Sequence, residues 1–86
     1  MPLDVPSPIQ PEAVVAGTLC LMSCFAQARS PRHAQRIATN LDLLARDAGV
    51  TAEMRTLCRR LAQRWDAIAL DMVTRGESEP VDLNLH

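Results

Sequence analysis

The fold is decided by residues 13–28, which read AVVAGTLCLMSCFAQA and contain no charged residue. On a helix of about 100° per residue, the polar edge of this segment is a strip only about 60° wide. That strip holds Glu12, Ala16, Ser23, Gln27 and Ser30. The rest of the helix circumference is apolar, so other helices must pack around most of it to exclude water. We therefore expect a second copy of the chain, or another protein, to complete its packing.

Length and composition favour a single helical domain. A chain of 86 residues is expected to bury only about 60–65% of its unfolded surface, so association would stabilise it. The aromatic residues are Phe25 and Trp65 alone. A core built mainly from Leu and Ala suits the packing of helix on helix more than a sheet. The sequence therefore predicts an all-α domain.

Prolines and capping residues predict where the elements begin. Three prolines within residues 1–10 predict an extended, Pro-rich N-terminal arm. Pro11 then begins a predicted helix over 11–28, and Ser30 with Pro31 begins a second over 31–48, with Gly49 as its C-terminal cap. Thr51 caps a third predicted helix over 52–75.

The third predicted helix is longer than the second can cover. Its apolar residues follow a spacing of three and four, as in a coiled-coil seam: Met54, Leu57, Cys58, Leu61, Trp65, Ile68, Ala69 and Met72. Its C-terminal part should therefore pack on the first helix or on another chain. We expect a small three-helix antiparallel bundle, or helical hairpin, in a domain over 11–76 that dimerisation completes.

The segment after the third helix, residues 77–86, begins with acidic residues and then alternates Val81, Leu83 and Leu85 with polar ones. Such a tail is either flexible or docked in a groove as an extended segment. Both possibilities stay open from the sequence.

Surplus apolar residues are the candidates for partner binding. On the first helix these are Val15, Leu19, Met22 and Ala26, and on the second Leu43 projects from the polar face. The uncovered end of the third helix adds Trp65, Ile68 and Met72. The expected partner is a protein, either a second copy in a homodimer or a different chain.

Three cysteines and one histidine suggest an alternative interpretation, in which they form a zinc site. Cys20 and Cys24 lie one turn apart on the first helix, Cys58 lies on the third, and His33 begins the second. Three thiolates and an imidazole can hold zinc tetrahedrally. Metal motifs usually pair cysteines within a short loop, however, and buried cysteine often packs as a small apolar side chain. We therefore expect no metal and no cofactor.

The stretch LARDAGVT at residues 44–51 resembles the turn of a DNA-binding helix-turn-helix. The resemblance implies that the following helix contacts DNA, with phosphate contacts from Arg55, Arg59, Arg60 and Arg64. Arg55 stands where the motif has an apolar residue, and the following helix is longer than a usual recognition helix. A DNA-binding transcriptional regulator using residues 44–64 is the alternative function.

Charge and motif content exclude several other classes. With a formal net charge of −1, the overall electrostatic field of the chain does not attract nucleic acid or an anionic membrane surface. No nucleophile has a histidine and an acid nearby in sequence, and there is no glycine-rich phosphate loop, so we expect no enzyme. Residues 1–12 contain no Lys or Arg, which argues against a signal peptide, and the apolar stretch is short for a membrane span. Three cysteines, an odd number, do not suggest a set of disulfide bonds. Proteins without disulfide bonds are typical of the reducing cytoplasm, so we expect a cytoplasmic protein.

These observations predict a cytoplasmic, non-enzymatic helical module for protein interaction. It would act as a small adaptor, regulator or secretion-type chaperone that self-associates or shields an apolar helix of a partner.

Overall fold

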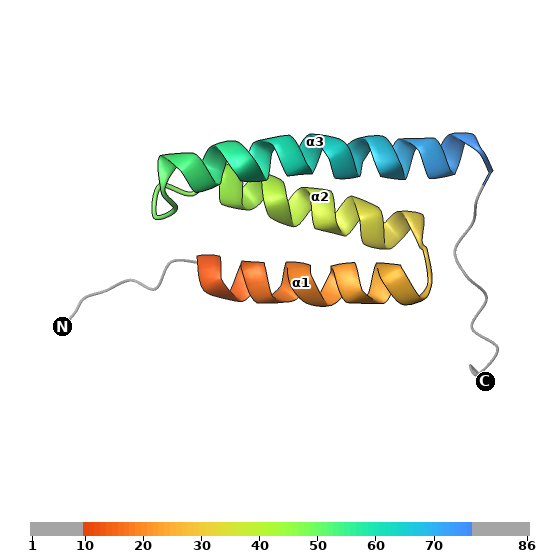
Figure 1. The fold of residues 1–86 in the computed structure, drawn as a ribbon, viewed down its shortest axis with the longest axis horizontal. Coiled ribbons are helices and arrows are strands. Elements are labelled where there is room, and N and C mark those ends of the chain that lie inside the picture. Colours follow the sequence, from red (N-terminus) through yellow and green to blue (C-terminus); the bar gives the residue numbers. More distant parts are fainter. Residues whose placement is uncertain (1–9, 77–86) are drawn as a thin grey trace.

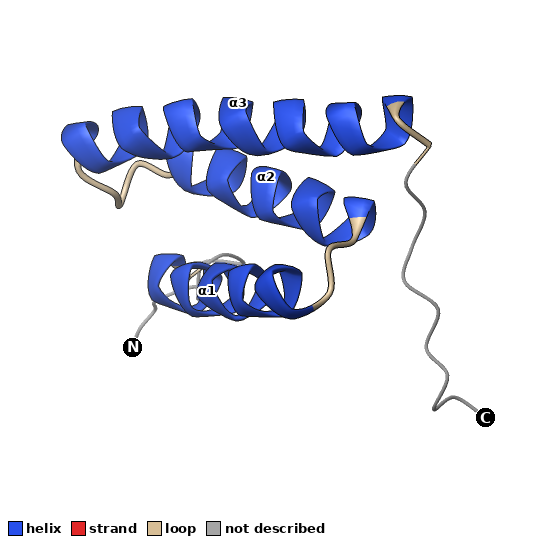
Figure 2. Ribbon diagram, turned by 45° about the vertical axis from the view of Figure 1, so that its right-hand side comes forward, coloured by secondary structure: helices blue, strands red, loops and turns tan. Residues whose placement is uncertain are grey.

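The computed structural model describes residues 10–76, and within that range the chain forms three helices and no strand (Figure 1). They are α1 (Pro11–Gln27), α2 (Pro31–Ala45) and α3 (Ala52–Thr74). The prediction of an all-α chain is therefore confirmed, and Figure 2 shows short loops joining the helices. The predicted arm, except for Gln10, and the tail over 77–86 lie outside the described residues.

Local chemistry explains where each helix begins. Proline occupies the first turn of α1 and of α2, where its missing N–H would have no partner in any case. The Ser30 hydroxyl accepts a hydrogen bond from the His33 N–H at 3.3 Å. The Thr51 hydroxyl accepts one from the Met54 N–H at 3.2 Å. Both hydroxyls thereby satisfy a backbone donor at a helix N-terminus.

The end of α2 differs from the prediction. The helix ends at Ala45 instead of residue 48. The Asp47 carboxylate accepts a hydrogen bond from the Gly49 N–H at 2.8 Å, and the Asp47 carbonyl accepts one from the Val50 N–H at 3.0 Å. A short polar side chain that bonds its own backbone competes with the helix in this way. Gly49 is not a left-handed cap, since Gly76 is the one described residue with positive φ, at 79°.

The second helix is the centre of the fold. It packs against both α1 and α3, whereas the backbones of α1 and α3 do not approach each other closely (Figures 1 and 2). The buried core joins α2 to α3 through Ile37, Leu41, Leu44, Ala45, Cys58 and Ala62. Several of these side chains are small, which lets the two helices pack closely.

The first helix adds little to the buried core. Its one buried residue is Thr18, whose hydroxyl donates a hydrogen bond to the Val14 carbonyl at 2.7 Å. Val14, Leu21, Met22 and Phe25 pack against the core but stay partly exposed. The uncharged part of α1, residues 13–27, is therefore only partly covered by its own chain. Among residues 10–76, no helix combines the length and hydropathy that crossing a membrane requires.

Candidate functional site

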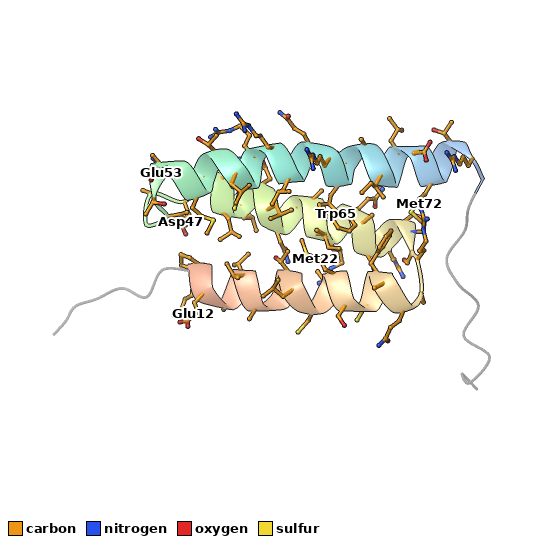
Figure 3. The ribbon with its side chains drawn as sticks, viewed as in Figure 1. Glu12, Met22, Asp47, Glu53, Trp65 and Met72 are labelled. Carbon is orange, nitrogen blue, oxygen red and sulfur yellow. The ribbon has the colours of Figure 1, made fainter. Side chains whose placement is uncertain are left out.

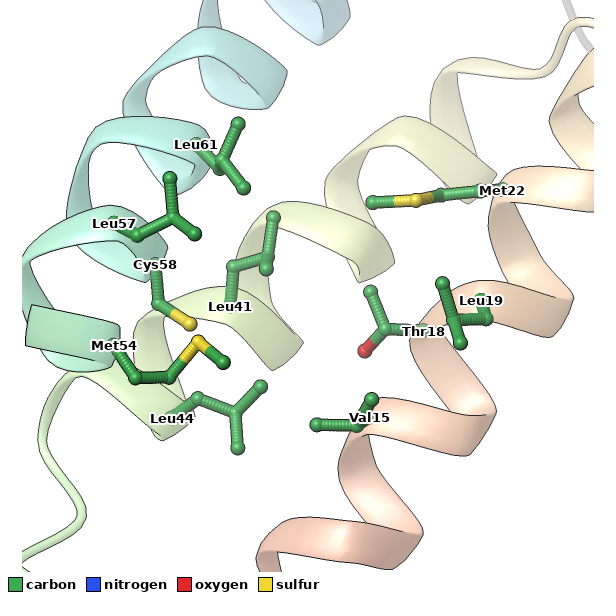
Figure 4. Close-up of a pocket in the computed structure, with 10 residues that line it drawn as sticks. All are labelled: Val15, Thr18, Leu19, Met22, Leu41, Leu44, Met54, Leu57, Cys58 and Leu61. Carbon is green, nitrogen blue, oxygen red and sulfur yellow. The ribbon is translucent and has the colours of Figure 1, made fainter. Parts of the chain in front are cut away.

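The open arrangement of the helices leaves an apolar groove between α1 and α3, with α2 at its base (Figure 4). Its volume is about 150 Å³. The lining side chains come from all three helices: Val15, Thr18, Leu19, Met22, Leu41, Leu44, Met54, Leu57, Cys58 and Leu61. The groove is therefore a composite surface that exists only once the three helices have packed.

Large apolar side chains stand exposed on both walls of the groove. On α1, Val15 is 39% and Leu19 60% exposed. On α3, Met54 is 45% and Leu57 50% exposed. Contiguous exposed apolar surface on a small protein marks an interaction site more often than scattered apolar residues do. These four side chains define the rim of the groove.

The groove offers no charge and little polarity to a ligand. Its one hydroxyl, on Thr18, already donates to the helix backbone. Burial raises the pKa of the Cys58 thiol, which stays protonated and neutral at physiological pH. A surface of this chemistry can gain free energy by excluding water but cannot hold an ion or supply an acid or base.

An aromatic pair lies one turn beyond the groove. The rings of Phe25 on α1 and Trp65 on α3 meet edge to face, with centroids 5.1 Å apart and planes at 87°. The Arg29 guanidinium carbon lies 5.5 Å from the centroid of the Phe25 ring. In Figure 3, Met22 and Trp65 lie in the space between α1 and α3, near this end. The pair thus bridges two helices whose backbones stay apart.

The structure brings together part of the predicted partner-binding set. Val15, Leu19 and Met22 all line the groove. Ala26 is exposed but lies outside the lining, and Leu43 is half-buried away from it.

The three candidates from the end of α3 have different surroundings. Trp65 and Ile68 are half-buried, and Trp65 contacts Phe25. Met72 is fully buried at 0% exposure, because it shares the core face of α3 with Ala69. Met72 therefore packs within its own chain and presents no surface to a partner, unlike the sequence-based expectation.

The α3 wall of the groove was missing from the predicted site. Met54, Leu57 and Leu61 belong to the coiled-coil seam of the sequence, where they read as internal packing. Because α1 does not close on α3, these positions remain open toward α1. Their spacing is that of core residues, so the sequence carries no signal that separates them from internal packing.

The four arginines of the alternative DNA-binding surface fall into two pairs, one that contacts the end of α2 and one that is exposed. Arg55 Nη1 donates to the Asp47 carbonyl at 3.5 Å, and Arg59 Nη2 donates to the Ala45 carbonyl at 3.4 Å. These two side chains satisfy carbonyls at the end of α2, as cations near a helix C-terminus do. Arg60 and Arg64 are exposed and have no ion-pair partner among residues 10–76.

The candidate metal ligands do not converge. Cys20 and Cys24 are exposed on α1, whereas Cys58 is buried on α3. The Nδ1 atom of His33 is buried without a hydrogen-bond partner in the described part of the chain. Across residues 10–76, no three His, Cys, Asp or Glu side chains lie close enough to share a metal ion.

The chain was compared with known protein families, curated proteins and solved structures. No protein-family model, curated protein or solved structure matches the chain.

Proposed function

We propose that this chain is a non-enzymatic protein-interaction module whose groove between α1 and α3 receives an apolar helix of a second protein molecule. The simplest such molecule is a second copy, since two-fold dimers are the commonest closed assemblies of soluble proteins. The role of a cytoplasmic adaptor, regulator or secretion-type chaperone belongs to this proposal. A surface that covers an apolar helix of a partner is compatible with each of these roles.

One observation carries the proposal, namely that Val15 and Leu19 face Met54 and Leu57 across an uncharged groove while all four stay exposed. Burial of apolar surface is worth about 25 cal/mol per Å². Full burial of one such side chain is therefore worth about 1.5–3 kcal/mol. Several side chains buried together give a binding site with a central apolar cluster, which is where interface energy concentrates.

The shape of the groove suits a helix. A helix laid over the mouth of the groove can place residues at i, i+3, i+4 and i+7 on its apolar lining, and the Phe25–Trp65 contact closes one end. The α1 helix of a second copy has the required chemistry, because it carries Val15 and Leu19 on its exposed side and no charge over residues 13–28. In a two-fold arrangement each copy would offer the same face.

Sedimentation equilibrium of the full chain over a wide concentration range tests this function. The average mass of the wild type should rise above the 9.5 kDa of one chain. Leu19→Asp should weaken association, because it places a charge in an apolar contact, and its 60% exposure means that the monomer tolerates it. Leu70→Asp is the matched control, since Leu70 is 68% exposed on α3 and does not line the groove. A wild-type mass that stays at 9.5 kDa throughout would contradict self-association.

A further inference from the structure

The first helix carries two exposed free thiols one turn apart. Cys20 and Cys24 are both exposed, whereas Cys58 is buried in the core. We propose that Cys20 and Cys24 together bind one soft monovalent metal ion such as Cu(I), held between their two thiolate sulfurs. Cys58 and His33, which the zinc interpretation also used, take no part in this site.

Packing within the chain does not explain the pair. Free cysteine is among the most buried residue types and usually serves as a small apolar side chain in a core. Cys58 follows this rule, with 3% of its surface exposed. Cys20 and Cys24 do not, because both are exposed on a helix whose one buried residue is Thr18. Two thiols on one exposed helical turn are therefore available to a ligand.

The spacing of the pair fits a single ion. Residues four apart on a helix are neighbours, with their Cβ atoms about 5–6 Å apart. A zinc–thiolate bond is about 2.3 Å long, and at that length two sulfurs on one ion lie roughly 3.8 Å apart in a tetrahedral arrangement and about 4.6 Å apart in a linear one. Two side chains that lean toward each other reach this separation. Two histidines at the same spacing on one helix face hold zinc in metalloproteases.

The chemistry of the pair selects a soft ion. Mg²⁺ and Ca²⁺ need oxygen ligands, whereas thiolates select Cu(I) and other soft ions. Residues 13–28 contain no charge, so no carboxylate stands beside the two sulfurs on α1. Structural zinc takes four protein ligands. Because this pair supplies two, an ion that accepts a linear pair of sulfurs fits it better than zinc does.

The surface around the pair is open to solvent. The exposed neighbours of the two thiols on α1 are small or uncharged, namely Ala16, Gly17, Ser23 and Gln27. A Cβ atom added to Gly17 would meet nothing within 4 Å beyond the local helix backbone. An ion can therefore reach both sulfurs without any movement of the helices.

The thiol pair is separate from the groove of the proposed function. At about 100° per residue, Cys20 lies about 100° and Cys24 about 140° around α1 from Leu19. Neither thiol lines the groove. A partner helix that covers Val15 and Leu19 therefore leaves the two sulfurs accessible, and metal binding does not depend on self-association.

Binding exchanges two protons for one ion. Each thiol releases its proton as its sulfur binds, so two neutral thiols and one monovalent cation give a bound unit of net charge −1 and two free protons. No electron is transferred. The bound ion links positions 20 and 24 across one turn of α1, so it stabilises the folded form of a helix that its own chain covers only partly.

Competition for Cu(I) against a chromogenic chelator tests the proposal, with the reduced full-length protein under an inert atmosphere. The wild type should bind one ion per chain. Cys24→Ser should weaken binding at least about 100-fold, because the second sulfur of a linked pair acts at a high effective concentration. Cys58→Ala should bind as the wild type does, because the buried thiol is not a ligand.

The matched control keeps the number of exposed thiols and changes only their spacing. In the double substitution Cys24→Ser with Gln27→Cys, the two thiols are seven residues apart, which is about 10.5 Å along the helix and beyond the span of one ion. Gln27 is exposed, so the fold tolerates this change. The control should bind as weakly as Cys24→Ser. Equal affinity of the control and the wild type would show adventitious binding to separate thiols and overturn the proposal.

The remaining outcomes are equally decisive. No transfer of Cu(I) from the chelator to the wild type would overturn the site. One ion per two chains would mean that sulfurs of two copies share it, which would overturn a site within one helix. Loss of binding in Cys58→Ala with an unchanged circular dichroism spectrum would do the same. Leu19→Asp should keep the wild-type affinity for Cu(I) whether or not it associates, so this test and that of self-association can fail separately.

Discussion

Phe25 and Trp65 join α1 to α3 through an edge-to-face ring contact with centroids 5.1 Å apart, although the backbones of the two helices stay apart. The contact lies one turn beyond Met22 on one wall of the groove and Leu61 on the other. It therefore sets the separation of the two walls at that end. The packing of both helices on α2 places their backbones, and the ring pair joins their side chains across the groove at this end.

Replacing Phe25 by Leu should lower the free energy of unfolding by about 1 kcal/mol, because an edge-to-face pair adds about 0.5–1.5 kcal/mol beyond the area buried. Chemical denaturation followed by circular dichroism measures this change. A double-mutant cycle with Trp65→Leu isolates the coupling between the two rings. A coupling energy of zero would show that the rings do not act as a pair in solution.

Removing the Ser30 hydroxyl should also lower stability. Ser30 is 1% exposed and caps α2 by accepting a hydrogen bond from the His33 N–H. Ser30→Ala should lower the free energy of unfolding by about 1 kcal/mol, the usual value of an N-cap. Ser23→Ala is the control, since Ser23 is exposed within α1 and alanine is the better helix former. Equal effects of the two substitutions would contradict the capping role.

The three cysteines should react in two phases with an excess of a thiol reagent. Cys20 and Cys24 are exposed, whereas Cys58 is buried in the core between α2 and α3. Two thiols should therefore be modified quickly and one only as the protein opens. Addition of denaturant should merge the two phases. Fast modification of all three thiols in the native protein would show that the core around Cys58 is open.

The free energy of unfolding should decline at alkaline pH because of Cys58. Burial raises the pKa of this thiol in the folded chain above the ordinary value of 9.0. The unfolded chain therefore loses the proton first as the pH rises, which favours unfolding above about pH 9 and not below it. Cys58→Ala should remove this part of the decline, and Cys24→Ala should leave it unchanged. Identical pH profiles for wild type and Cys58→Ala would contradict the assignment.

The all-α class could be predicted from the sequence because the local signals for helix starts all agree with it. Prolines at positions 11 and 31 and the hydroxyls of Ser30 and Thr51 act within one turn, so they can be read without a structure. The end of α2 was misjudged because the Asp47 side chain bonds the Gly49 N–H. That competition depends on conformation and not on periodicity.

The binding surface was only half visible in the sequence. Val15, Leu19 and Met22 stand out because α1 carries no charge around them. Met54 and Leu57 have the spacing of core residues, and their exposure follows from the gap between α1 and α3. Met72 shows the reverse case, an apolar residue near a helix end that the fold buries completely. Which of two apolar faces is covered depends on tertiary packing, which periodicity does not record.

Central to the proposed function is that the groove between α1 and α3 binds the apolar α1 of a second copy. The most direct measurement is the molar mass of wild type and Leu57→Asp by light scattering over a range of concentrations. Leu57 is 50% exposed on the α3 wall, so the substitution charges the groove while sparing the buried core. The wild-type mass should rise above 9.5 kDa with concentration, and the mass of the variant should stay at that value. A wild type and a variant with the same mass at every concentration would contradict it.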